Sequence, residues 1–180
     1  MLVALGLMLI LAPLFLFVVL GVKLTTAGPV LFRTRRVGKN RRLFTMYKFR
    51  TMRIDTPQVA THLLKEPAQF LTPFGAFFRR TSLDELPQLI NVLSGDMTLV
   101  GPRPALFNQD DLVALRTARG VDALTPGITG WAQVNGRDEL PIPEKVKLDE
   151  WYMRNRSFWL DLKIVGMTVF KVIRKEGVAH

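Results

Sequence analysis

The chain opens with an apolar run, residues 1–22, that contains no charged or strongly polar side chain. A helix over this run would be roughly 30 Å long at about 1.5 Å per residue, close to the thickness of a bilayer core. Pro13 lies near the middle, where the loss of one backbone hydrogen bond favours a kink. A cleaved signal peptide fits poorly, because no basic residue precedes the run. We expect a membrane-anchoring helix over residues 1–24, which either spans the bilayer or is re-entrant on one face.

Two strands are predicted next, over residues 30–36 and 41–52, around a turn at Gly38-Lys39-Asn40. In the second strand, alternation places Lys48 and Arg50 on the same face. The two cations could bind one anionic target together. An ordinary solvated strand face, with cations that extend into water, is the alternative.

Helical spacing predicts most of the remaining elements. The aromatic side chains within residues 70–78 fall on one helical face, which suits either a core helix or a membrane interface. Further helices are expected over residues 82–93, 110–120 and 157–176. Ser157 can cap the N-terminus of the last of these helices.

A short strand is predicted over residues 131–134, followed by a type I′ turn at Asn135-Gly136. The pattern as a whole predicts an α+β fold, mainly helical, with a β-hairpin and short strands. Residues 25–180 would form a second domain on the cytoplasmic face, with amphipathic helices at the membrane interface.

The net charge of +10 is distributed unevenly along the chain. Residues 1–53 hold ten Lys or Arg and no acid, whereas residues 54–180 hold fifteen of each sign. Basic residues beside an apolar segment suit anionic membrane lipid better than nucleic acid, and they favour the cytoplasmic side. The chain has no cysteine, which excludes disulfides and thiolate metal sites.

The adjacent acids Asp84 and Glu85 are the leading candidates for chemistry. With Ser82 they match a capping box, in which both would be ordinary acids of a first helical turn. Pro87 would then lie inside the helix, so the helix could instead begin at Pro87 and leave both acids in the preceding loop. In either arrangement an ionised carboxylate can attack phosphorus or hold Mg²⁺.

Two acids can approach a diphosphate only if cations or a metal neutralise the charge. Lys48, Arg50 and Arg103 are the candidate cations. Arg103 stands between two prolines that restrict its backbone, and its guanidinium can bind phosphate bidentately. An ordinary surface arginine in a structural turn is the alternative. The sequence contains no Walker phosphate loop, GxGxxG, GxSxG or zinc pattern.

These motifs together resemble the bacterial sugar transferases, also called monotopic phosphoglycosyl transferases, in their short catalytic form. The matching stretches follow family order and cover nearly the whole chain: Gly28-Pro29, Arg36-Val37-Gly38, Lys48-Phe-Arg-Thr-Met52, Thr81 to Leu93, Gly95 to Pro104, Pro126 to Arg137, Asp149 to Tyr152 and Asp161-Leu-Lys163.

The resemblance implies that a phospho-sugar moves from a UDP-sugar to polyprenyl (undecaprenyl) phosphate, with release of UMP. Asp84 would form a covalent aspartyl phospho-sugar, and Glu85, with Asp84, would hold Mg²⁺. Lys48, Arg50 and Arg103 would bind phosphate.

Three further residues, Gln133, Arg137 and Asp161, fall in matching motifs and are expected near the nucleotide or the site. The reaction would be the first membrane step of glycoconjugate assembly, such as lipopolysaccharide or exopolysaccharide, at the cytoplasmic face of the bacterial inner membrane.

The family anchor is a re-entrant helix broken at a Ser-Pro pair, whereas this chain has Ala12-Pro13. The topology therefore stays open, as do the sugar and the formation of a homo-oligomer. Three other functions remain: a non-catalytic membrane scaffold that binds anionic lipid through the basic hairpin, a nucleic-acid-binding module, and a hydrolase that uses an aspartyl phosphate. The nucleic-acid reading leaves the apolar segment unexplained, so no nucleic-acid partner is expected.

Overall fold

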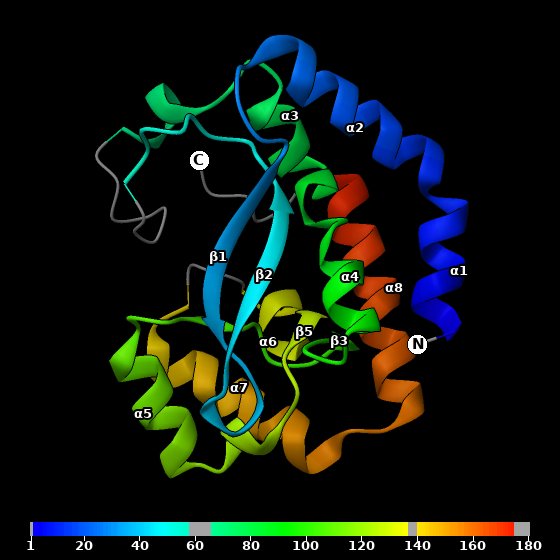
Figure 1. Cartoon of the computed structure of the whole chain (residues 1–180). Coiled ribbons are helices and arrows are strands. Elements are labelled where there is room, and N and C mark those ends of the chain that lie inside the picture. The colour runs from blue at the N-terminus through cyan, green and yellow to red at the C-terminus, as the bar shows by residue number, and fades with distance from the viewer. Residues whose placement is uncertain (1, 58–65, 137–139, 175–180) are drawn as a thin grey trace.

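The computed structural model describes residues 2–57, 66–136 and 140–174. It has mixed helix and strand, as predicted (Figure 1). The helices are α1 (Leu2–Ile10), α2 (Ala12–Thr25), α3 (Gly75–Arg80), α4 (Gln88–Leu93), α5 (Asp110–Ala118), α6 (Trp131–Val134), α7 (Ile142–Asn155) and α8 (Phe158–Arg174), with 3₁₀ turns η1 (Lys39–Arg41), η3 (Pro67–Phe70), η4 (Leu83–Glu85) and η5 (Val121–Ala123). The strands are β1 (Leu31–Val37), β2 (Leu43–Phe49), β3 (Thr98–Val100), β4 (Ala105–Leu106) and β5 (Gly127–Thr129).

The apolar N-terminal segment forms two helices, α1 and α2, that meet at an angle of 61°. Pro13 lies in the first turn of α2, where its missing N–H is tolerated, and it cannot donate to the carbonyl of Leu9. The predicted kink is thereby confirmed. Within the described ranges, no one helix has the length and apolar composition to cross a membrane, although the bent pair taken together has both.

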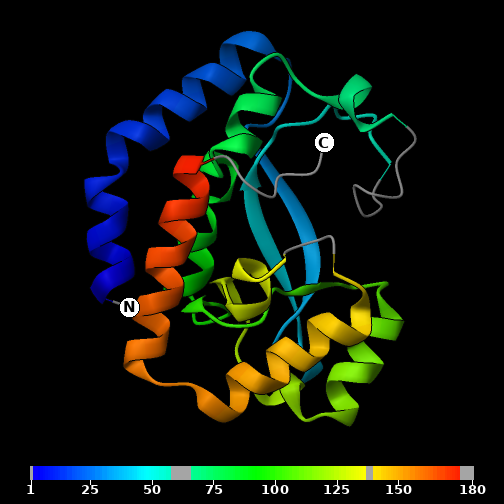
Figure 2. The same cartoon turned by 180° about the vertical axis from the view of Figure 1, so that it is seen from behind.

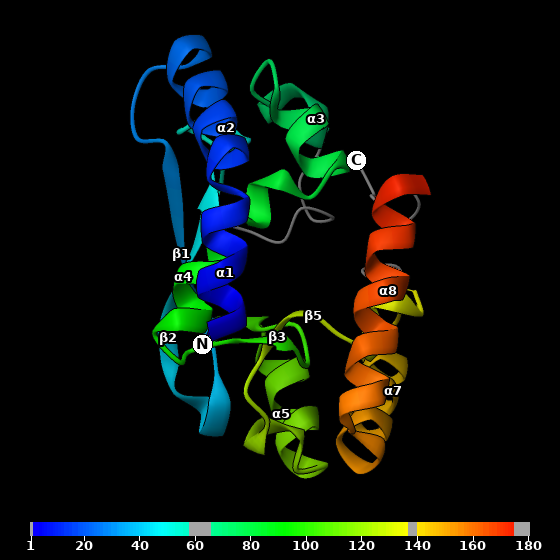
Figure 3. The same ribbon diagram turned by 90° about the vertical axis from the view of Figure 1, so that its right-hand side faces the viewer.

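The predicted hairpin is also confirmed. β1 and β2 pair antiparallel, from Leu31 opposite Phe49 to Val37 opposite Leu43, and β4 adds to the other edge of β1. The connection covers residues 38–42, two more than the predicted triplet, and within it Asn40 and Arg41 have positive φ angles of 52° and 61°. A separate parallel pair, β3 with β5, lies between the hairpin and the C-terminal helices (Figure 3).

Asp84 and Glu85 precede α4, so the second of the two expected arrangements, in which both acids lie before the helix, is correct. Ser82 adopts a left-handed conformation with φ 55° and forms no capping bond, and the helix begins after Pro87. The capping box is therefore wrong, and Asp84 and Glu85 occupy the separate turn η4.

Two other expectations are wrong. Residues 131–134 form α6 instead of a strand, and Asn135 has φ −116°, which excludes a type I′ turn. The helix α7 was not predicted, because its buried positions, Val146, Asp149 and Tyr152, include a carboxylate that obscures the apolar pattern. α7 and α8 form the far side of the molecule, as the view from behind shows (Figure 2). The C-terminal helix matches its prediction within a few residues, and Ser157 Oγ accepts from the Leu160 N–H.

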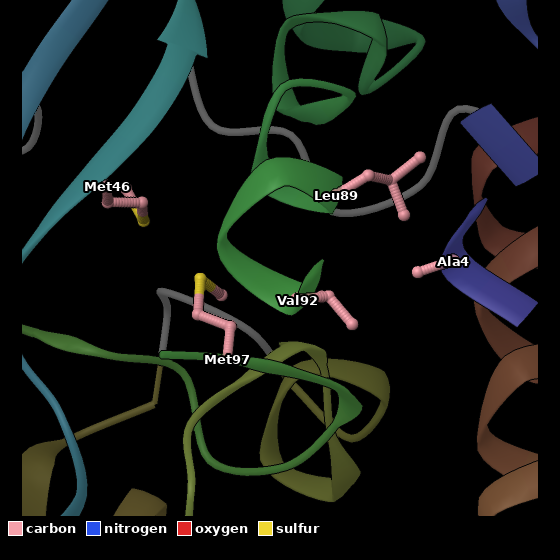
Figure 4. Packing of buried hydrophobic residues seen from close by; sticks show 5 residues of the cluster. All are labelled: Ala4, Met46, Leu89, Val92 and Met97. Carbon is pink, nitrogen blue, oxygen red and sulfur yellow. The ribbon is translucent and has the colours of Figure 1, made fainter. Parts of the chain in front are cut away.

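The main apolar core joins α4 to the hairpin and to α1. Its buried side chains are Met46 of β2, Leu89 and Val92 of α4, Met97 just before β3, and Ala4 of α1 (Figure 4). The view shows α4 lying between β2 and α1. The N-terminal helices are thus part of the folded core and position α4 from one side.

Asn91 attaches α4 to the free edge of β2. Its side-chain amide accepts from the Tyr47 N–H at 3.1 Å and donates to the Thr45 carbonyl at 2.7 Å. These are the hydrogen bonds that a neighbouring strand would make, so Asn91 satisfies an edge that would otherwise be unpaired. Because Asn91 is only 1% exposed, water cannot replace it.

We expect Asn91→Ala to destabilise the chain by about 3 kcal/mol, because two buried backbone groups lose their partners. The melting temperature of the purified chain should fall by roughly 6–12 °C. Asn155→Ala is the matched control, since its exposed amide only donates to Trp151 in the same helix. Equal melting temperatures for the two variants would contradict the role given to Asn91.

Candidate active site

Four of the predicted site residues come together from three separate segments. Glu85 of η4 receives hydrogen bonds on Oε1 from Lys48 Nζ of β2 at 2.7 Å and from Arg103 Nη2 at 3.0 Å. The Lys48 ammonium also lies 3.8 Å from Asp84 Oδ2. The two acids and two of the three expected cations therefore form one cluster.

The two carboxyl groups have opposite electrostatics. Burial raises the pKa of the Asp84 carboxyl, and the attraction of Lys48 does not fully offset this effect. Burial also acts on Glu85, but Lys48 and Arg103 together outweigh it and hold the pKa of that carboxyl well below its ordinary value. Glu85 is therefore a fixed anion, and Asp84 is a buried carboxylate whose charge is only partly compensated.

Arg103 is held in place by a buried network that the sequence analysis missed. Arg116 of α5 donates through Nη1 to the Arg103 carbonyl at 2.8 Å. Its Nε and Nη2 both donate to Asp149 Oδ2 of α7, at 3.0 Å and 2.6 Å. Arg116 thus fixes the backbone of Arg103 against two helices. Only Asp149, which stands in a family motif, gave any sign of this network in the sequence.

Arg50, the third expected cation, points elsewhere. Its guanidinium donates to the Ala27 carbonyl at 2.6 Å and to Thr26 Oγ1 at 2.8 Å. Both acceptors follow the C-terminus of α2, where a cation is favourable to the helix dipole. In this structure Arg50 fastens the N-terminal helices to the hairpin.

The remaining predicted residues are placed differently. Gln133 of α6 donates to the Ile128 carbonyl at 3.1 Å and lines the same cavity as Glu85 and Arg103. Asp161 of α8 accepts from Tyr152 Oη at 2.7 Å, which joins α7 to α8. Arg137 lies outside the described residues.

The site has two of the ligands that a magnesium ion requires, but it is not a closed metal site. Across residues 2–57, 66–136 and 140–174, no three or more His, Cys, Asp or Glu side chains gather to hold an ion. Mg²⁺ usually binds one or two carboxylates together with substrate phosphates and water. The Asp84 and Glu85 carboxylates fit this requirement if a substrate supplies the phosphate oxygens.

The profile of the bacterial sugar transferase family matches residues 1–175, and the chain belongs to this family. The resemblance inferred from the motifs is therefore confirmed. The chain is 47% identical over 163 residues to the uncharacterized sugar transferase EpsL of Bacillus subtilis, covering 91% of this chain and 79% of EpsL.

Two further relatives have names that state a reaction. The UDP-glucose:undecaprenyl-phosphate glucose-1-phosphate transferase of Xanthomonas campestris is 43% identical, covering 89% of this chain and 35% of its own length. The undecaprenyl-phosphate galactose phosphotransferase of Salmonella typhimurium is 38% identical, covering 83% and 34%. The chain therefore spans about a third of the length of these two transferases.

The opposite electrostatics of the two acids predict opposite stability effects in metal-free buffer at pH 7. Burial raises the pKa of Asp84, so its ionised form destabilises the folded state at pH values above 3.8, the ordinary pKa of the carboxyl. Asp84→Asn removes this cost and should raise the melting temperature by about 2–4 °C. The pKa of Glu85 is lowered, so its stabilisation is present above 4.5 and is lost as the pH falls. Glu85→Gln should lower the melting temperature by roughly 6–12 °C, because the partly buried Lys48 and Arg103 lose the anion that they share.

The Asp84→Asn difference should shrink as the pH is lowered toward 3.8, whereas the Glu85→Gln difference should persist down to 4.5 and shrink only below that pH. A scan of melting temperature against pH measures both. Shifts of the same sign at pH 7 would contradict the assignment of a compensated and an uncompensated carboxylate.

Proposed function

We propose that the chain transfers a sugar-1-phosphate from a UDP-sugar to polyprenyl phosphate and releases UMP. The observation that carries this proposal is the buried Asp84 beside a Glu85 carboxylate fixed by Lys48 and Arg103. The names of the Xanthomonas and Salmonella relatives support these classes of donor and acceptor.

In the first half-reaction, an Asp84 carboxylate oxygen forms a bond to the β-phosphorus of the UDP-sugar. The bond from that phosphorus to the oxygen bridging the two phosphates breaks, and UMP leaves with the electron pair. The product is a phospho-sugar attached to Asp84. A carboxylate that is buried and incompletely paired is a stronger nucleophile than a solvated one.

In the second half-reaction, a phosphate oxygen of the polyprenyl phosphate forms a bond to the same phosphorus. The bond to Asp84 breaks, which restores the carboxylate and gives a polyprenyl-diphosphate-sugar. Lys48 and Arg103 neutralise negative charge beside the reacting phosphorus in both steps. Their shared contact with Glu85 keeps them aimed at the same place.

Mg²⁺ would be held by Asp84 and Glu85 together with diphosphate oxygens, where it would neutralise charge on the diphosphate. We place Gln133 near the reacting phosphates because it lines the cavity beside Glu85 and Arg103. We place Arg137 and Asp161 near the nucleotide because both fall in family motifs. Arg50 could bind phosphate only if its hydrogen bonds to Thr26 and Ala27 were broken.

We further propose that α1 and α2 are re-entrant at the cytoplasmic face of the bacterial inner membrane. Exposed apolar side chains on these helices support membrane contact, among them Leu9, Ile10 and Leu16. α8 adds Phe158 and Trp159, which are 73% and 75% exposed. Basic residues such as Lys171 would meet anionic lipid.

The activity test is UMP release by the purified protein in detergent with Mg²⁺, undecaprenyl phosphate and a panel of UDP-sugars. One or two sugars should give UMP that depends on the lipid acceptor. Asp84→Asn should lower the rate at least about 10³-fold, as expected when a covalent nucleophile is lost. Asp110→Asn, on the exposed start of α5, is the control and should leave the rate unchanged. An unchanged rate in Asp84→Asn would remove Asp84 as the nucleophile.

The topology test uses the absence of native cysteine. A cysteine placed at Val3, which is 64% exposed, should resist a membrane-impermeant thiol reagent added to intact spheroplasts, because a re-entrant helix keeps the N-terminus on the cytoplasmic side. A cysteine at Asp110 is the cytoplasmic control, and lysis should expose both. Labelling of the Val3 cysteine in intact cells would favour a spanning helix.

A further inference from the structure

A cavity of about 260 Å³ opens beside two of the charged groups of the site, Glu85 and Arg103. Two helices from opposite ends of the chain, α1 and α8, form facing walls, and the segment from α3 to α4, the strands β3 and β5, and α6 contribute most of the rest. Figure 3 shows α1 and α8 standing on either side of the β3–β5 pair. We call this space the α1–α8 cavity.

The chemistry of the α1–α8 cavity changes from one region to another. Most of its wall is aliphatic, including Leu7 of α1, Leu11 at the break between α1 and α2, and Val165, Val169 and Val172 of α8. The hydroxyls of Thr129 and Thr168, which also line it, are 2.7 Å apart and bond each other. This part of the wall therefore offers little to a polar ligand; apart from the charged groups, the other polar side chains that line the cavity are Ser82 and Gln133.

Charged side chains also line the α1–α8 cavity. Glu85 and Arg103 belong to the site cluster, and Arg80 and Lys171 add two more cations. A ligand that fits this pattern has an anionic head and a long apolar chain. A nucleotide sugar does not fit the aliphatic wall, because its hydroxyls and base would be buried without hydrogen-bond partners.

The wall formed by α8 is accessible from outside. Val165 and Val169 are 38% and 53% exposed although they line the cavity. Covering this apolar surface would be favourable, because it removes aliphatic side chains from water. A chain could therefore enter sideways between α1 and α8, without passing through the charged region.

We propose that the α1–α8 cavity binds the phosphate-proximal part of the polyprenyl chain, and so delivers the acceptor phosphate to Asp84. This inference rests on the proposed function, since it concerns the second substrate of that reaction. It gives the cavity-lining faces of α1 and α8 a role in acceptor recognition; Asp161, near the start of α8, does not line the cavity.

The test separates the two half-reactions in the purified full-length chain. Exchange of labelled UMP into UDP-sugar, measured without lipid, reports the first half-reaction alone, whereas transfer to undecaprenyl phosphate reports both. Val169→Trp, which fills the cavity from an exposed position, should raise the apparent KM for undecaprenyl phosphate at least about tenfold, expressed as mole fraction in the micelle. The exchange rate should stay within about twofold of wild type, well under the tenfold effect expected on the acceptor.

Leu162→Trp is the matched control, because Leu162 is on the same helix and equally exposed at 53%, but does not line the cavity. It should change neither reaction. Leu7→Trp, on the facing wall, should reproduce the effect of Val169→Trp.

An unchanged acceptor KM in both cavity variants would overturn the proposal, and so would a loss of exchange together with transfer, which would point to the nucleotide sugar as occupant. Equal effects of Leu162→Trp and Val169→Trp would also overturn it, since they would indicate general membrane contact. If wild type transfers the sugar without any exchange, the covalent mechanism fails, but the acceptor KM still decides whether the cavity binds the chain.

Discussion

The arrangement of the site depends on the Glu85 carboxylate, because one of its two oxygens, Oε1, accepts hydrogen bonds from both Lys48 and Arg103. A charge with so little access to water is tolerated only when it is paired. The pairing joins β2, η4 and the segment after β3, which are far apart in the sequence. The same cations therefore fix Glu85 firmly and leave Asp84 with a weaker contact, 3.8 Å from Lys48. The same two neighbours thus compensate the charge of Glu85 fully and that of Asp84 only in part.

Two buried polar contacts hold this cluster at the correct spacing. Asn91 attaches α4, and with it the turn η4, to the edge of β2 that carries Lys48. Arg116 holds the Arg103 carbonyl while it pairs with Asp149. The apolar core around Met46 and Leu89 then keeps the bent N-terminal helices against the same α4, which links these helices to the site.

The parts of this structure with a strong local signal could be predicted from the sequence. The hairpin follows from its turn residues, the kink from Pro13, and the candidate acids from their adjacency and family motif. The contacts that bring the site together could not be predicted, because Asn91, Arg116 and Arg50 act on backbone groups far away in the sequence. Alternation placed Lys48 and Arg50 on one face of the strand, yet a carbonyl-rich helix end attracts Arg50 away from the acids. α7 was missed because a buried ion pair replaces one apolar position of its inner face.

The central claim is that Asp84 becomes covalently attached to the phospho-sugar. The most direct measurement is mass spectrometry of the protein after brief incubation with Mg²⁺ and its active UDP-sugar, without lipid acceptor, followed by acid quenching. The account predicts that the peptide containing Asp84 gains the mass of the sugar phosphate, and that adding undecaprenyl phosphate before quenching removes this mass. A modification on another residue, or sugar transfer to lipid with no modified peptide at any time, would contradict it.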